Sequence, residues 1–348
     1  MRVADSTTVR NYLGYLDQAK TNYATTNLRI ASGERFSAIS DDVSAGTRVL
    51  RVRADKNKAE EYYDTVKAVD DQLSVTENAV SSINTALSAV HTKIVKAETA
   101  TTGDSGRATI AKEIDNLKSE VLSYLNTKYN NSYALGGSGS TTAPFAVGSD
   151  GKLTYNGIRV SDIKYDTSSN QYVYGNDNAI PMDSDVYADI GLGLQMKTTT
   201  VGDATSDVQS DTAFKVSYSG LEVIGIPKDG TTTSDGTANN IYDMLTDVSA
   251  AMTSNDVTKL GTLDGTLTTM RENLVDKLTE IGTRTSYLDG IKNSLETKID
   301  SYTNQISNLM GIDDAKEATN QTLNDYVLKA VLSMGSKILP VSLMDYLK

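Results

Sequence analysis

The stretch AEEYYDTVKAVDDQLSVTENAVSSINTALSAVHTKIVKA, from Ala59 to Ala97, carries apolar residues at alternating spacings of three and four. Such spacing predicts a long helix that buries one stripe. Neither glycine nor proline interrupts the chain between Thr47 and Thr102, so at about 1.5 Å per residue we expect a helix of roughly 80 Å. The stripe consists of Ala59, Tyr62, Val66, Val69, Leu73, Thr76, Val80, Ile83, Leu87, Val90, Ile94 and Ala97.

A second helix is expected directly after the first. The glycine-containing segment 103–106 ends the long helix, and Asn130-Asn131 suit the end of the next one. Two apolar-striped helices joined by a short turn form an antiparallel hairpin. The stripe of the second helix consists of Ile110, Ile114, Leu117, Val121 and Tyr124.

The helical pattern returns near the other end of the chain, where one heptad frame runs from Leu263 to Leu309. Gly311 suits the end of this helix, and Asp313-Asp314 suit the start of a final one. The frame holds Leu263, Leu267, Met270, Leu274, Ile281, Leu288, Ile291, Leu295, Tyr302 and Leu309, with Lys277, Arg284, Lys298 and Gln305 at its polar positions.

Between the helical ends the composition changes. From Gly136 to about Asn239 the chain is rich in Gly, Thr, Ser and Asp, and turn pairs such as Asn156-Gly157 separate short β-prone runs. We therefore expect a small β domain inserted into a helical rod, which leaves both chain ends on the same side of the insertion. The predicted strands are 152–155, 159–165, 171–174, 214–218 and 221–226.

The composition narrows the class of protein. The 348 residues include no Cys, no Trp and one His, and the net charge is −12. The lack of Cys excludes disulfide scaffolds and Cys-ligated zinc, and the acidic charge argues against a nucleic-acid partner. Residues 1–20 lack the apolar core of a cleaved secretory signal, and no run is long enough to insert into a membrane. We expect a protein that either stays in the cytoplasm or is exported without a cleaved signal.

The C-terminal stretch QTLNDYVLKAVLSMGSKILPVSLMDYLK, from Gln321 to Lys348, indicates assembly. It favours a helix that is apolar on more than one side and therefore needs burial on several sides. We expect the N-terminal helix to pair with it, and the pair to pack against neighbouring subunits. The predicted assembly residues are Val9, Leu13, Leu16, Tyr23, Leu323, Tyr326, Val327, Ala330, Val331, Met334, Ile338 and Leu343.

No catalytic, cofactor or metal site is expected. His91 has no motif partner, so the simplest interpretation is a histidine on a helix surface. Adjacent acids such as Asp41-Asp42 point about 100° apart on a helix, so they make poor acid–base pairs. Asp183-Ser184-Asp185 lacks the Gly and Glu of a calcium loop, and Gly191-Leu192-Gly193 lacks the third Gly of a nucleotide loop.

Two motifs resemble those of the bacterial flagellin superfamily. Segment 31–42, ASGERFSAISDD, is similar to its SGxRI…xxDD stretch, although Ala38-Ile39 replace a more polar pair and no Pro follows Asp42. Segment 133–145, with Leu135 in place of the usual aromatic residue, resembles the YxFxGxxTxxxPF junction of the hook-associated protein 3 family, and the ending 337–347 is also similar. The family-motif residues are Gly33, Arg35, Asp41, Asp42, Tyr133, Gly136, Pro144 and Phe145.

The resemblance implies a mainly α fold with an inserted β domain, in which both chain ends form a long antiparallel coiled-coil bundle. It also implies a structural role without cofactor, joining the hook of the bacterial flagellum to its filament. Members of this family form an extracellular homo-oligomeric layer between another hook-associated protein and flagellin. Their export uses no cleaved signal, and a flagellar export chaperone holds the C-terminal helix.

Three parts are therefore expected. Residues 1–45 with 305–348 form the terminal coiled coil that assembles, residues 46–137 with 240–304 form the rod, and residues 138–239 form the outer β domain. Two alternatives stay open: flagellin itself, which shares both ends, and a secreted adhesin whose Tyr-rich β domain binds a surface ligand. The motif at 133–145 and the ending at 342–347 favour the junction protein.

Overall fold

The computed structural model describes residues 2–99, 102–138, 141–168, 171–176, 178–180, 183, 185–191, 196–199, 205–208, 213–226 and 238–346. It divides into two compact units, Met1–Glu60 with Glu296–Lys348 and Glu61–Leu295. Each unit combines segments from both halves of the chain. Two long helices, α2 (Val43–Glu98) and α6 (Val257–Met310), contribute to both units.

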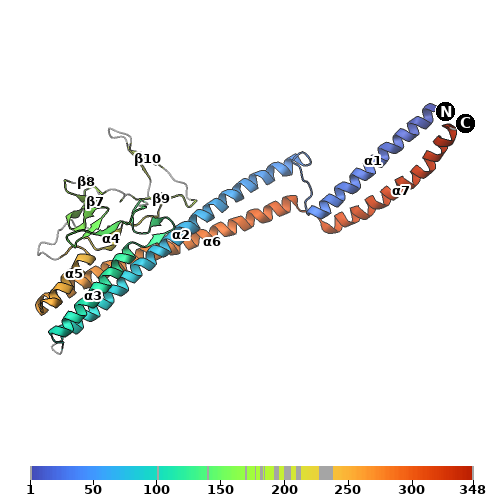
Figure 1. Cartoon of the computed structure of the whole chain (residues 1–348). Coiled ribbons are helices and arrows are strands. Elements are labelled where there is room, and N and C mark those ends of the chain that lie inside the picture. Colours follow the sequence, from blue (N-terminus) through green and yellow to red (C-terminus); the bar gives the residue numbers. More distant parts are fainter. Residues whose placement is uncertain are drawn as a thin grey trace. The chain divides into compact units, whose positions relative to one another are not determined.

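The first unit contains the two terminal helices. α1 (Arg2–Ser32) and α7 (Asp314–Tyr346) lie side by side, with both chain ends at the same end of the pair (Figure 1). The predicted pairing of the chain ends is therefore confirmed. A small apolar core lies where α1 connects to α2 and α6 connects to α7, and it consists of Phe36, Ala45, Val49 and Met310.

In the second unit α2 packs against α6 along the predicted stripe. All stripe residues are buried except Tyr62, which is partly buried. Polar contacts join the two helices beside the stripe: Arg271 Nε donates to Asn84 Oδ1 at 3.5 Å, and Lys292 Nζ donates to Asp70 Oδ2 at 3.4 Å. The helical prediction from the 3,4 spacing is therefore confirmed.

α3 (Asp104–Leu125) returns along α2. Arg107 Nε donates to the Ala97 carbonyl at 2.8 Å, and Lys93 pairs with Glu113. The predicted end near Asn130-Asn131 is wrong, because the chain there forms the hairpin of β1 (Lys128–Tyr129) and β2 (Ser132–Tyr133). Asn130 takes a φ of 51°, which Asn tolerates in tight hairpin turns.

The β region consists of small antiparallel sheets with the strand orders β1-β2, β3-β4-β5, β6-β7-β8, β10-β11 and β12-β9. The predicted strands at 152–155 and 171–174 are confirmed, whereas a 3₁₀ turn at Val160–Asp162 divides the one at 159–165. The further strands are β3 (Phe145–Val147), β4 (Leu153–Tyr155), β5 (Ile158–Arg159), β6 (Ile163–Asp166), β7 (Gln171–Tyr174), β8 (Asn178–Ala179), β9 (Tyr187–Ala188), β10 (Met196–Thr199), β11 (Thr205–Val208) and β12 (Phe214–Lys215).

The strand predicted at 221–226 is wrong, because this segment forms the short helix α4 (Gly220–Val223) and a turn. Ser219 Oγ accepts a hydrogen bond from Leu221 N at 3.2 Å and so caps the helix, while Gly225 has a φ of 91°. A short, mostly apolar and mostly buried run has too little periodicity to separate helix from strand. α5 (Ile241–Thr253), which packs on α3, follows this segment.

The described helices contain no apolar stretch of the length and hydropathy that crossing a membrane requires.

Candidate functional site

The contact between α1 and α7 is partly polar. On α1, Tyr12, Ala19 and Thr26 are buried and lie seven residues apart, so they form one seam. Hydrogen bonds and one ion pair cross to α7 near the seam. These are Asn324 Nδ2 to Thr26 Oγ1 at 2.8 Å, Gln321 Nε2 to Asn27 Oδ1 at 2.8 Å, and Arg29 Nη1 to Glu317 Oε1 at 3.6 Å.

Most of the predicted assembly residues lie outside this seam. Tyr326 is 72% exposed, Leu323 is 58% exposed and Leu13 is 53% exposed. We call the exposed set the terminal surface: Leu13, Leu323, Tyr326, Val327, Ala330 and Met334. Val9, Leu16, Tyr23 and Val331 are partly buried, and Ile338 and Leu343 lie in α7 with side chains outside the described residues.

A groove between the two helices adjoins the terminal surface. It has a volume of about 420 Å³ and is lined by Thr8, Asn11, Tyr12, Tyr15, Val331 and Met334. Beside it, Gly335 packs so closely on Tyr12 that an added Cβ would overlap the Tyr12 hydroxyl. This glycine therefore permits the close approach of α7 to α1.

The first family motif ties the two helix connections of the first unit together. Arg35 N donates to the Met310 carbonyl at 2.6 Å, and Ile312 N donates to the Gly33 carbonyl at 3.3 Å. The result is a short antiparallel bridge between the α1–α2 connection and the α6–α7 connection. The two connections are thus held as one structure.

The charged residues of the same motif hold the start of α2. Arg35 Nη2 lies 2.9 Å from Asp42 Oδ2, and Asp42 Oδ1 accepts from Ala45 N at 2.9 Å as a helix cap. Asp41 Oδ2 accepts from Ala38 N at 3.2 Å in the preceding turn. Both acids therefore have structural partners.

The second family motif lies at the base of the β region. Leu135 and Phe145 are buried, and Phe145 exchanges two hydrogen bonds with the Asn126 side chain: its carbonyl accepts from Nδ2 at 2.9 Å and its N donates to Oδ1 at 3.1 Å. Gly220 N donates to the Leu135 carbonyl at 3.0 Å. The motif thus fastens the β region to the end of α3 and the start of α4.

The other residues of that motif shape the same junction. The Tyr133 ring lies under Lys128 Nζ at 4.8 Å, and Gly136 forms an isolated bridge to the segment before α4. The Pro144 carbonyl accepts from Asn156 N at 2.8 Å. Tyr133, Gly136, Pro144 and Phe145 therefore each have a structural partner within the second unit.

Parts of the chain are similar in sequence to known flagellar proteins. Residues 6–140 match the family model described as the bacterial flagellin N-terminal helical region. Over 119 residues, 34% of the chain, the sequence is 28% identical to flagellar hook-associated protein 3 of Escherichia coli. Over 180 residues, 51% of the chain, it is 22% identical to flagellar hook-associated protein 3 of Salmonella typhimurium. The matched parts span 38% and 56% of these relatives' own lengths.

The N-terminal part of the chain is therefore similar to that of bacterial flagellins, and the chain is similar to flagellar hook-associated protein 3. Among solved structures it is similar to FlgL from Bacillus cereus, with a TM-score of 0.50 and 17% identity over 75% of this chain and 99% of that one. At 17% identity, this similarity supports a shared fold and nothing further.

Gly33 provides a direct test of the first motif. It takes a φ of 68°, and a Cβ there would meet no neighbouring atom within 4 Å, so only backbone strain opposes a side chain. We expect Gly33→Ala to lower the free energy of unfolding of the first unit by about 1 kcal/mol, and Gly33→Asn to cost less, because Asn tolerates this conformation. Thermal unfolding followed by circular dichroism measures both. Equal losses for Ala and Asn would contradict the backbone explanation.

His91 has a partner that the sequence did not indicate. Its Nδ1 lies 2.6 Å from Asp264 Oδ1 on α6, so the ring links the two long helices. Among the residues that the structure describes, no three His, Asp or Glu side chains gather as a metal site. The predictions for Asp183-Ser184-Asp185 and Gly191-Leu192-Gly193 include Ser184, Leu192 and Gly193, which lie outside the described residues.

Several structural residues were not singled out from the sequence. Asp243 is buried in α5, where its N donates to Asn240 Oδ1 at 2.9 Å and its Oδ1 accepts from Leu153 N at 3.2 Å. The Asn-x-x-Asp spacing is a variant of a capping box, so the sequence could have predicted this helix start. Asn126 and Gly220 offered no such signal, because their partners are distant in the sequence.

A partly buried hydrogen bond joins the end of β4 to Asp183, which precedes β9. The Tyr155 hydroxyl donates to Asp183 Oδ1 at 2.9 Å. Burial raises the pKa of Asp183 above its ordinary value, and the hydrogen bonds from Ser219 and Tyr155 offset only part of this effect. The folded protein therefore holds this proton at a pH where the unfolded chain has released it.

This pKa shift predicts a pH dependence of stability. Because the pKa of Asp183 is higher in the folded state, the folded state binds more protons than the unfolded chain. The free energy of unfolding therefore falls as pH rises from about 3.9, the ordinary pKa of Asp, toward the folded pKa. Asp183→Asn keeps an acceptor for Tyr155 and should flatten this decline. Melting temperatures of both proteins from pH 4 upward measure it. A difference between the two proteins that does not change with pH would contradict the prediction.

Proposed function

We propose that this chain is a structural subunit of the bacterial flagellum that joins the hook to the filament. The observation that carries the proposal is the terminal surface: large apolar side chains stay exposed on two helices that already pair with each other. Burying a side chain of that size stabilises an assembly by roughly 1.5–3 kcal/mol. The natural occupant is the terminal surface of another copy, because a homo-oligomer repeats the same contact at each subunit.

The domain roles follow from this proposal. Residues 1–45 with 305–348 would form the assembling coiled coil, residues 46–137 with 240–304 the rod, and residues 138–239 the outer β domain. The relatives' name, flagellar hook-associated protein 3, supports an extracellular position in the flagellum. The layer would contact another hook-associated protein on one side and flagellin on the other.

Export would occur without a cleaved signal. α7 combines helix-forming residues with exposed apolar ones, which suits binding by an export chaperone before assembly. A chaperone on α7 would cover the terminal surface and keep subunits from associating early.

Deletion of the gene tests the proposal. We would examine the cells by electron microscopy and blot the medium for flagellin. Complete hooks without filaments, together with flagellin in the medium, support the junction role. Hooks without flagellin in the medium indicate that the chain is the filament subunit, and normal filaments contradict both.

A further inference from the structure

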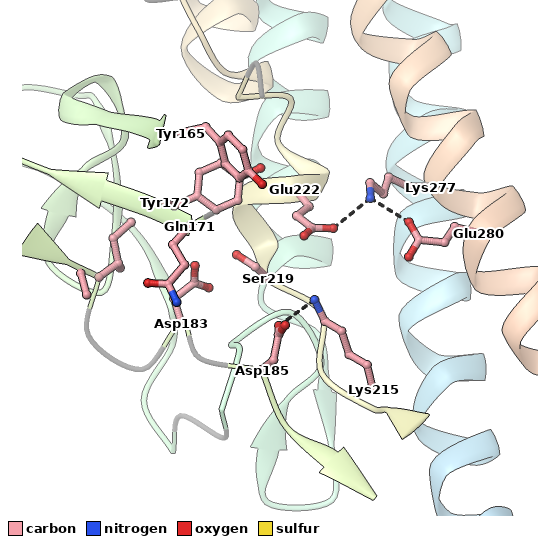
Figure 2. Close-up of a pocket in the computed structure, with 12 residues that line it drawn as sticks. Tyr165, Gln171, Tyr172, Asp183, Asp185, Lys215, Ser219, Glu222, Lys277 and Glu280 are labelled. Atoms are coloured by element: carbon pink, nitrogen blue, oxygen red, sulfur yellow. Dashed lines mark hydrogen bonds and ion pairs between the residues drawn. The ribbon is translucent and has the colours of Figure 1, made fainter. Parts of the chain in front are cut away.

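A polar pocket lies where the β6-β7-β8 sheet meets α4 and α6 in the second unit (Figure 2). Its volume is about 370 Å³, within the range of roughly 300–1,000 Å³ usual for small-molecule sites. The family motifs do not contribute to it. Residues that line it include Tyr165, Tyr172, Asp183, Ser219, Glu222 and Lys277.

Tyr172 is the clearest sign that the pocket receives a ligand. The residue is 6% exposed, and its hydroxyl has no hydrogen-bond partner among the residues that the structure describes. A buried hydroxyl without a partner is costly, and such groups are rare in folded proteins. Figure 2 shows its hydroxyl end directed toward Glu222, across the pocket.

The aromatic wall of the pocket is built from two rings. Tyr165 and Tyr172 meet edge to face with centroids 5.1 Å apart. Tyr165 is partly exposed, so part of its ring stays accessible from the pocket side. Such a ring packs well against the C–H groups of a ligand that also carries polar groups.

The charged side chains of the pocket are already paired. Lys277 Nζ lies 2.9 Å from Glu222 Oε2 and 2.8 Å from Glu280 Oε2. Lys215 Nζ lies 2.6 Å from Asp185 Oδ1. Burial lowers the pKa of Lys277, but its hydrogen bonds to the two glutamates outweigh burial and raise it overall. Neither lysine is therefore an unpaired cation for an anionic ligand.

The remaining polar groups are suited to a neutral ligand. Gln171 supplies both donors and an acceptor, and the paired carboxylates keep lone pairs for further hydrogen bonds. Asp183 is the one lining acid without a lysine or arginine partner among the described residues, and burial raises its pKa. The pocket thus combines many hydrogen-bonding groups, an aromatic face and compensated charge.

We propose that this pocket binds a carbohydrate the size of a monosaccharide, with the Tyr172 hydroxyl bonded to a sugar hydroxyl and the Tyr165 ring against the sugar face. A sugar presents vicinal hydroxyls to carboxylates and amides while offering apolar C–H groups to an aromatic ring. This proposal concerns the β region alone and does not depend on the junction role.

The test uses the purified full-length chain and two matched variants. Methyl glycosides of glucose, galactose, mannose and N-acetylglucosamine are titrated while saturation-transfer NMR reports binding. Tyr172→Phe removes the unpaired hydroxyl and keeps the ring. Tyr218→Phe is the control, because the Tyr218 hydroxyl is also buried without a partner among the described residues but does not line the pocket.

We expect saturable binding of at least one glycoside to the unmodified chain. Tyr172→Phe should weaken it roughly fivefold to tenfold, the usual effect of losing one neutral hydrogen bond, and Tyr218→Phe should leave it unchanged. Both variants should keep the melting temperature, since neither hydroxyl has a partner in the free protein. The proposal is overturned if no glycoside binds, or if Tyr172→Phe binds as well as the unmodified chain.

Discussion

Removal of residues 323–348 is expected to leave the unit Glu61–Leu295 folded and to abolish assembly at the hook. The deletion removes all of the terminal surface that α7 carries and also takes Asn324, the partner of Thr26, from α1. The second unit has its own buried core between α2 and α6, so it should keep its helical circular dichroism and its cooperative melting. Cells carrying only the truncated chain should have hooks without filaments.

A deletion of this size also removes the segment proposed for the chaperone, so point variants separate assembly from export. Leu323→Ser with Tyr326→Ser changes two exposed side chains of α7 that have no role in the α1 seam. Each loses an expected burial of roughly 1.5–3 kcal/mol at every subunit contact, and the loss is repeated around the layer. We expect the double variant in the medium of cells that lack filaments.

The control variant is Val275→Ser on α6, an apolar residue that is 47% exposed in the second unit. It should support normal filament number, because it lies outside the terminal surface. Normal filaments on cells with the double variant would mean that subunits meet through another surface.

Gly220→Ala is expected to destabilise the second unit by about 3 kcal/mol. A Cβ at this position would overlap the Phe145 ring and lie 2.8 Å from the Leu135 carbonyl oxygen. Because Leu135 and Phe145 are buried and Phe145 is held on both backbone groups by Asn126, neither neighbour can move aside at low cost. Calorimetry of the purified chain should show a lower melting temperature for the transition of this unit.

Gly265→Ala is the matched control on α6, where a Cβ would meet nothing within 4 Å. Since Ala favours an exposed helix over Gly by up to about 1 kcal/mol, this variant should melt at the same temperature or slightly higher. Similar losses in both variants would show that the close packing on Phe145 is not the cause.

The long helices could be predicted because their signal is repeated. Each stripe position from Val66 to Ala97 is buried, so a single exchange does not hide the period. The short segments lacked this redundancy. Residues 221–226 are apolar except for Glu222 and show no clear period, so the Ser219 cap and the positive φ of Gly225 decided between helix and strand there.

The terminal helices were recognised as a pair, but not the residues that join them. The sequence analysis singled out the apolar positions of these helices. The hydrogen bonds of the seam, however, involve the polar residues Thr26, Asn324 and Gln321. From sequence alone, polar residues on a helix are expected to face solvent. Their partners lie almost 300 residues away in the chain, so no local pattern reveals the pairing. The assembly role of the apolar positions stays a prediction.

The contacts of the family-motif residues needed the structure. Gly33 and Arg35 bond across to Met310 and Ile312, and Phe145 bonds to Asn126. No local sequence pattern predicts such pairings, because they form between segments that meet only in the folded chain.

The most direct test of the central claim is immunogold electron microscopy of intact flagella. The antibody would be raised against the purified chain and adsorbed on cells that lack the gene. The proposed junction role predicts gold in one narrow band between hook and filament. Gold along the whole filament, or its absence from the flagellum, would contradict that role.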